Sequence, residues 1–190
     1  MPAGKDLSGD VESVRMREKM PIGQGAASDG HQSDREAVIK ILNDALATEI
    51  VCVLRYRRHY CMALGIRAES FASGFLEHAG EEQSHADQIV TRIVQLDGAP
   101  DFSTYGLQAR SRSEYGGSTD LAGMLQEDLV AERMAIDTYR EIIRSLGDDD
   151  PATCRMMETI LASEVGHAGN LHCRLEELQR KTSEIPSLLD

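Results

Sequence analysis

The chain has 190 residues and a mass of 20.9 kDa, which is enough for one well-buried core and too little for two ordinary domains. Its net charge of −12 and its pI near 4.9 argue against a general binder of nucleic acid or anionic membranes, because phosphate contacts need clustered Lys and Arg. The same charge suits a protein that handles cations. No apolar run approaches the ~18 residues of a membrane span, and Met1–Asp10 lack the apolar region of a secretory signal, so we expect a cytoplasmic protein.

Four cysteines are present, and no two of them form a Cys-x-x-Cys pair. This pattern excludes a zinc ribbon and a rubredoxin-type iron site. We expect reduced, mostly buried thiols. They are Cys52, Cys61, Cys154 and Cys173.

The composition divides the chain into three parts. Residues 1–34 are rich in Gly, Ser and Asp and predict a flexible amino-terminal arm. A short amphipathic helix over Val11–Met20, lying on a partner subunit, is the alternative. Residues 35–181 are predicted to form one all-α domain, and residues 182–190, interrupted by Pro186, a short carboxyl-terminal tail.

Four stretches of this domain have apolar residues at three- and four-residue steps, which predicts four helices. The first begins after Asp34, a good N-cap, and ends at Gly65. The others cover about residues 68–96, 119–146 and 151–181. Residues 98–118 show no helical stripe; extended, they reach on the order of 60 Å, so we interpret them as a crossover along a four-helix bundle.

Six side chains repeat between the two predicted hairpins. Each hairpin has one glutamate on the apolar stripe of its first helix and a Glu-x-x-His set on its second, and three residues place both members of a set on one helix face. The six are Glu49, Glu82, His85, Glu132, Glu164 and His167. The midpoints of the two glutamate spacings fall at Gly65 and Asp148, inside the predicted turns. All six side chains are therefore expected at one depth in the bundle.

Four buried carboxylates repel each other and are costly to desolvate, and two divalent cations would compensate them. Six oxygen and nitrogen donors without a thiolate suit iron or manganese better than structural zinc, and two histidines disfavour magnesium or calcium. A Glu from each of two helices with Glu-x-x-His from the other two is the di-iron arrangement of ferritin-like bundles.

With these motifs, the chain resembles the bacterioferritin and Dps-like branch of the ferritin-like superfamily over about residues 35–178. The agreement is best in four segments, Leu46–Val51, Glu81–Asp87, Glu127–Glu132 and Ile160–His167. The resemblance implies two iron ions per subunit, with Glu82 and Glu164 as bridging carboxylates. It also implies Glu49 with His85 as terminal ligands of one iron and Glu132 with His167 as those of the other.

Tyr56 is similar to a tyrosine that the family places beside the centre, and a core tyrosine is its equally weighted alternative. Bacterioferritin binds haem through a methionine at the position of Gln83, so we expect no haem by that route. The family's acidic partner before the second bridging glutamate is Ser163 here. Asp128, one turn before Glu132, is left as the carboxylate expected to orient His167.

The function that the resemblance implies is ferroxidation. Fe²⁺ is oxidised by O₂ or H₂O₂ at the di-iron centre, and the Fe³⁺ mineral is stored in a homo-oligomeric shell, with oxidative-stress protection as a consequence. The short carboxyl terminus favours a 12-subunit shell over a 24-subunit one. The alternatives are a non-storage di-iron or di-manganese enzyme such as a peroxidase or catalase, a DNA-binding Dps-type protector, which the acidic charge disfavours, and a purely structural bundle.

Overall fold

The structure, a computed structural model, describes residues 29–113, 115–147 and 149–183. The predicted arm, except for residues 29–34, and the tail beyond Ser183 lie outside the described residues, as does the possible helix over Val11–Met20. The part of the chain that is described contains helices and no strand. No helix in this part is both long enough and apolar enough to cross a membrane.

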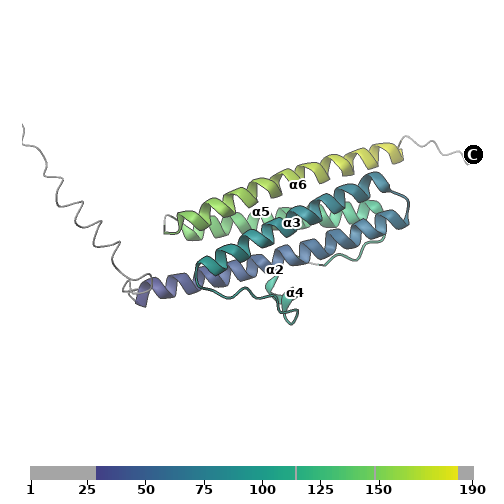
Figure 1. The fold of residues 1–190 in the computed structure, drawn as a ribbon. Coiled ribbons are helices and arrows are strands. Elements are labelled where there is room, and N and C mark those ends of the chain that lie inside the picture. Colours follow the sequence, from purple (N-terminus) through teal and green to yellow (C-terminus); the bar gives the residue numbers. More distant parts are fainter. Residues whose placement is uncertain (1–28, 114, 148, 184–190) are drawn as a thin grey trace, which may run out of the picture. The chain divides into compact units, whose positions relative to one another are not determined.

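Four long helices form the predicted bundle. They are α2 (Asp29–Gly65), α3 (Glu69–Gln95), α5 (Leu121–Leu146) and α6 (Pro151–Ser183). Their axes lie side by side and close to parallel (Figure 1). Residues through Glu36 belong to a separate unit, so the bundle is described from Ala37.

The first helix begins earlier than predicted. Asp34 was expected as its N-cap, but α2 already includes Asp29–Ser33. No proline interrupts these residues, and extending an existing helix costs little because only nucleation is unfavourable.

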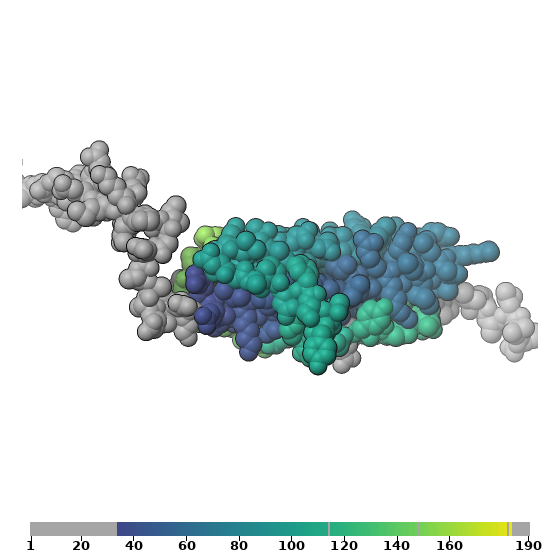
Figure 2. Space-filling model, turned by 60° about the horizontal axis from the view of Figure 1, so that its bottom comes forward, coloured from purple at the N-terminus to yellow at the C-terminus, as the bar shows by residue number. Residues whose placement is uncertain are grey.

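The crossover runs beside α2 and is tied to it along its course. Near its start, the amide of Asp101 donates to Asn43 Oδ1 at 2.7 Å. Further on, the amide of Arg112 donates to Thr48 Oγ1 at 3.1 Å, and Arg58 Nη1 donates to the carbonyl of Ser118 at 2.9 Å. Figure 2 shows the teal crossover residues on the surface beside the purple and blue residues of α2. The prediction that the crossover contains no helix is wrong for one turn, α4 (Leu107–Arg110). This turn follows Gly106, whose φ is 78°.

The two hairpin turns lie where the glutamate spacings predict them. α2 ends at Gly65 and α3 starts at Glu69, while α5 and α6 are joined by residues 147–150. Gly147 has φ 53° and ψ −136°, a conformation that favours glycine. Asp150 accepts from the amide of Thr153 at 3.0 Å and from Arg92 Nη2 at 2.8 Å, which joins the start of α6 to the end of α3.

Two apolar clusters fill the bundle, one on each side of its middle. The first cluster is centred on Leu42, Leu46, Ile89, Ile93, Tyr139, Ile142, Met157 and Ile160. The second cluster is centred on Tyr56, Phe75, Met124, Leu125, Leu129, Leu171 and Leu175. On each long helix the predicted metal ligands lie between the residues of the two clusters.

The cysteines are free thiols, but the expectation that most are buried is wrong. Cys52 is buried, whereas Cys61 and Cys173 are exposed and Cys154 is intermediate. The periodicity of α2 and α6 places the two exposed thiols on solvent-facing positions.

Candidate metal centre

The structure brings all six predicted side chains together in the middle of the bundle. Glu49 comes from α2, Glu132 from α5, and one Glu-x-x-His pair from each of α3 and α6. Each of the six residues is at most 5% exposed. Together they form two overlapping groups of possible metal ligands.

Glu82 and Glu164 each lie between the two histidines, with one carboxylate oxygen toward His85 and the other toward His167. His85 Nδ1 lies 3.1 Å from Glu164 Oε1 and 3.6 Å from Glu82 Oε2. His167 Nδ1 lies 3.2 Å from Glu164 Oε2 and 3.2 Å from Glu82 Oε1. These two carboxylates therefore occupy the positions that bridging ligands need.

Glu49 and Glu132 each belong to one side of the centre. Glu49 Oε2 lies 3.5 Å from His85 Nδ1, and Glu132 Oε2 lies 3.8 Å from His167 Nδ1. The first possible metal position is surrounded by Glu49, Glu82, His85 and Glu164, and the second by Glu82, Glu132, Glu164 and His167.

The atoms that point into the centre lack hydrogen-bond partners although they are buried. They are Glu49 Oε2, Glu82 Oε1, both Glu164 carboxylate oxygens, His85 Nδ1 and His167 Nδ1. A buried polar atom without a partner costs on the order of 1–3 kcal/mol. Six such atoms lie at one place, and all are of types that bind metals, which fits a pair of divalent cations.

The charge distribution without metal divides the carboxylates into two kinds. Burial and the charge of Glu82 raise the pKa of Glu49, and likewise that of Glu132, well above the ordinary value. Burial also raises the pKa of Glu82, but the close approach of His167 and His85 outweighs it and holds this pKa below its usual range. In the same way, contacts from the two histidines lower the pKa of Glu164 despite burial and the charge of Glu82.

Both histidines take up protons in the metal-free centre. Burial lowers the pKa of His85, but its close contacts with Glu164 and Glu49 outweigh burial and raise it to about 12. Burial acts in the same direction on His167, and its contacts with Glu132 and Glu164 raise its pKa well above the ordinary value. Two imidazolium groups thus face two ionised carboxylates.

Tyr56 lies beside the second metal position. Its hydroxyl donates to Glu132 Oε1 and lies 3.1 Å from His78 Nδ1. The ring is fully buried within the second cluster, so Tyr56 is at once a core residue and a neighbour of a candidate ligand.

The role expected for Asp128 is corrected by the structure. Its Oδ1 accepts from Arg55 Nε at 2.8 Å and its Oδ2 lies 2.9 Å from His59 Nδ1, so it does not orient His167. Arg55 is 1% exposed, so its guanidinium needs a buried counter-charge. Both partners of Asp128, Arg55 and His59, come from the side of α2 that faces α5.

The partner of His167 is Glu81, which sequence reasoning missed. Glu81 Oε2 lies 2.5 Å from His167 Nε2, the nitrogen on the far side from the centre. Ser163 Oγ lies 3.4 Å from the same nitrogen. The sequence contains one indication of this contact: Glu81 directly precedes the candidate ligand Glu82, and from the edge of α3 its side chain reaches His167 on α6.

His78 is a second residue for which no role was predicted from the sequence. It lies one turn before Glu82 on α3 and is 6% exposed. Its ring stacks on that of His167 with centroids 4.4 Å apart and 21° between the planes. Burial and the neighbouring His167 lower its pKa to about 4, so His78 is neutral at neutral pH.

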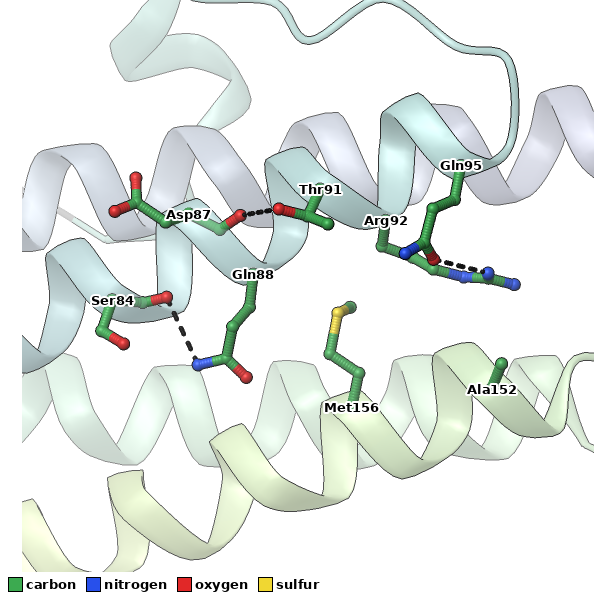
Figure 3. A pocket seen from close by; sticks show the side chains of 8 residues that line it. All are labelled: Ser84, Asp87, Gln88, Thr91, Arg92, Gln95, Ala152 and Met156. Atoms are coloured by element: carbon green, nitrogen blue, oxygen red, sulfur yellow. Dashed lines mark hydrogen bonds between the residues drawn. The ribbon is translucent and has the colours of Figure 1, made fainter.

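A groove lies between α3 and α6, next to the helix turns that carry His85. It has a volume of about 390 Å³ and is lined by Ser84, Asp87, Gln88, Thr91, Arg92, Gln95, Ala152 and Met156. Figure 3 shows Gln88 and Met156 between the two helices and Arg92 bonded to Gln95. Arg92 also pairs with Asp150, and the lining contains one carboxylate, so this groove offers no metal site. Gln83, at the position of the family's haem ligand, is exposed and donates to Asp87 at 3.0 Å.

Comparisons with known proteins agree with the geometry. The chain matches the model of the family Ferritin, described as the ferritin-like domain, over residues 39–181. It is 32% identical to bacterioferritin of Brucella melitensis over 146 residues, covering 75% of this chain and 85% of that protein. It is 30% identical to bacterioferritin of Mycobacterium avium over 166 residues, covering 82% of this chain and 94% of the other.

Among solved structures, the chain is similar to a dodecameric thioferritin, the bacterioferritin-related protein of Bacteroides fragilis. The TM-score is 0.73 at 27% identity, with 93% of this chain and 99% of that chain covered. The fold, the ligand spacing and these relatives lead to one conclusion: the chain belongs to the ferritin-like domain family, among the homologues of bacterioferritin.

Proposed function

We propose that this chain oxidises Fe²⁺ at the buried six-residue centre and stores the product as a ferric mineral inside a homo-oligomeric shell. The observation that carries the proposal is the arrangement of Glu82 and Glu164, each presenting one oxygen to either side. Iron oxidation and storage is the function of its bacterioferritin relatives, which do not favour the non-storage di-iron or di-manganese alternative.

In this proposal two Fe²⁺ ions are the substrate. Glu49 and His85 bind one ion, Glu132 and His167 bind the other, and Glu82 and Glu164 bridge them. Each ion gives up one electron; two electrons and two protons convert O₂ to H₂O₂, or H₂O₂ to two water molecules. The hydroxyl of Tyr56 fixes one oxygen of Glu132 and leaves the other for the metal.

The proposal includes a cytoplasmic location and the absence of haem. Gln83 carries an amide where the haem ligand of bacterioferritin is a methionine, and its side chain is engaged with Asp87. An amide is a poor substitute for a thioether as an axial ligand of haem iron.

For the assembly we favour twelve subunits. The similar bacterioferritin-related structure is dodecameric. Phe102 and Tyr105 on the crossover are 57% and 93% exposed, as expected of side chains that contact another subunit.

The test is an isosteric change of one bridging carboxylate. Fe²⁺ is added in air to the wild type, to Glu164→Gln, and to Glu158→Gln, a matched control at an exposed position of the same helix. We expect the wild type and the control to form a ferric core in a particle near twelve times 20.9 kDa, and Glu164→Gln to lose at least about tenfold in oxidation rate. A small oligomer that holds only about two irons per chain would overturn storage, and equal rates in all three proteins would overturn the centre.

A further inference from the structure

His78, Glu132 and His167 form a third group of possible metal ligands, beside the two groups of the proposed centre. One ligand atom of each lies within 4.8 Å of the others, and all three residues are buried. Glu132 and His167 already belong to the second metal position, so His78 is the new member. It lies one turn before Glu82 on the same helix.

The hydrogen bonds around Tyr56 determine which nitrogen of His78 is open. A phenol has one proton, and the Tyr56 hydroxyl donates it to Glu132 once that carboxylate is ionised by a bound cation. The phenol oxygen then accepts from His78 Nδ1, 3.1 Å away. In that tautomer the lone pair of the neutral ring is on Nε2, and a neutral imidazole binds a metal through the nitrogen that carries the lone pair.

The ring is also held beside the second position. It stacks on His167 at 4.4 Å and meets Tyr56 edge-on at 5.1 Å, so its orientation is fixed from two sides. No residue in the group around Glu49 and His85 plays an equivalent part, because that group contains one histidine. The two halves of the centre therefore differ by one imidazole.

We propose that His78 is a seventh metal-binding side chain, which supplies a second nitrogen to the cation held by Glu132 and His167. This inference rests on the proposed di-metal centre and makes it asymmetric. The first position has three carboxylates and one imidazole; the second has three carboxylates and two imidazoles. Because nitrogen donors favour the later divalent metals, the second position fills first with Co²⁺ or Zn²⁺.

The test uses Co²⁺, which stays divalent in the absence of a strong oxidant. The metal-free, assembled full-length protein is titrated anaerobically as wild type, His78→Phe and His78→Gln. Phenylalanine keeps an aromatic ring against His167, and glutamine keeps a hydrogen bond to Tyr56. We expect two Co²⁺ per chain in the wild type and, in both variants, one binding step weakened at least about tenfold while the other is unchanged.

X-ray absorption on the Co²⁺-loaded proteins counts the nitrogen ligands directly. Three imidazoles shared by two cations are expected in the wild type, and two in either His78 variant. A purely structural role of His78 would not change this count. Two imidazoles in the wild type would overturn the inference while leaving the di-metal centre intact, and a wild type that binds no pair of Co²⁺ would overturn both.

Two controls separate the ligand role from its alternatives. His172→Phe removes an exposed histidine of α6 that pairs with Glu176, and it must leave both steps and the imidazole count unchanged. Tyr56→Phe keeps His78 but removes the hydroxyl. Because the hydroxyl also orients His78 and Glu132, Tyr56→Phe is expected to weaken the same step, but less than His78→Phe does. If His78→Gln, which keeps the hydrogen bond to Tyr56, binds both Co²⁺ ions as tightly as the wild type, His78 acts only by positioning Tyr56 and the inference is wrong.

Discussion

Among single residues, Asp128 shows how a correct position can receive a wrong role. The sequence places it on the buried face of α5, one turn before Glu132, and the structure agrees. Its partners come from α2, a helix distant in sequence, and helical spacing does not say which polar residue of a facing helix is nearest. Asp128 forms a structural ion pair with Arg55, not a support for His167.

Replacing Asp128 by alanine is therefore expected to reduce stability more than metal binding. It leaves the buried guanidinium of Arg55 without its carboxylate, which costs about 3–5 kcal/mol. Urea unfolding of the metal-free protein measures the loss, and Co²⁺ titration should still give two ions per chain. Asp137→Ala, which removes an exposed pair with Arg140 on the same helix, should cost no more than about 1 kcal/mol.

The protonation of the centre predicts proton release on metal binding. His85, with a pKa raised to about 12, and His167 carry protons that a cation must displace. Glu49 and Glu132, whose pKa values are raised by burial and by Glu82, supply the rest. Two divalent cations then replace about four protons and leave the buried charge unchanged.

The measurement is a pH-stat titration of the metal-free protein with Zn²⁺ near pH 7. Affinity should rise with pH, because the ligands must lose protons. The stability of the metal-free protein should instead fall as the pH rises, because the pKa of His85 is higher in the folded chain than in the unfolded chain. Its contribution is complete below about pH 6.5 and is lost as the pH rises toward 12. Fewer than two protons released would contradict this charge distribution.

At the level of the helices, the equal distance of each glutamate pair from its turn was the most informative sequence signal. The turns near Gly65 and Asp148 were predicted from the ends of the helical patterns, and each levels one pair, Glu49 with Glu82 and Glu132 with Glu164; the helix ends confirm both turns. The start of α2 and the turn of α4 could not be predicted, since neither has an apolar stripe. The contacts of Glu81 and His78 with neighbouring helices depend on rotations that the sequence does not specify.

The turn between α5 and α6 depends on Gly147. Its φ of 53° with ψ of −136° strains any other residue by about 1–3 kcal/mol, although no side-chain clash would occur. Gly147→Ala should therefore destabilise the metal-free protein by that amount. Gly80→Ala, on the exposed face of α3 with equally open surroundings, should instead stabilise it by about 0.5–1 kcal/mol, and chemical unfolding distinguishes the two signs.

For the whole molecule, each proposed metal position draws its candidate ligands from three helices. The first joins α2, α3 and α6, and the second joins α3, α5 and α6. Cations bound there would therefore crosslink the bundle at its middle. At a free concentration of 100 times Kd, one cation should stabilise the fold by about 2.7 kcal/mol.

Thermal unfolding with Zn²⁺ and with a chelator measures this effect. The midpoint should rise with Zn²⁺ in the wild type and rise much less in Glu82→Gln, which removes a ligand of both positions. An equal rise in both proteins would mean that Zn²⁺ binds elsewhere.

The two apolar clusters also determine how an ion reaches the centre. Residues such as Ile93 and Met157 close the bundle on one side of the ligands, and Phe75 and Leu125 close it on the other. A hydrated cation cannot travel along the axis through either cluster without losing its water to hydrocarbon. The short route is sideways between α3 and α6, where Glu81, with its side chain 48% exposed, contacts the outer nitrogen of His167. In the proposed function, iron would therefore enter through the side of the bundle between α3 and α6, and the two apolar clusters would contribute only to stability.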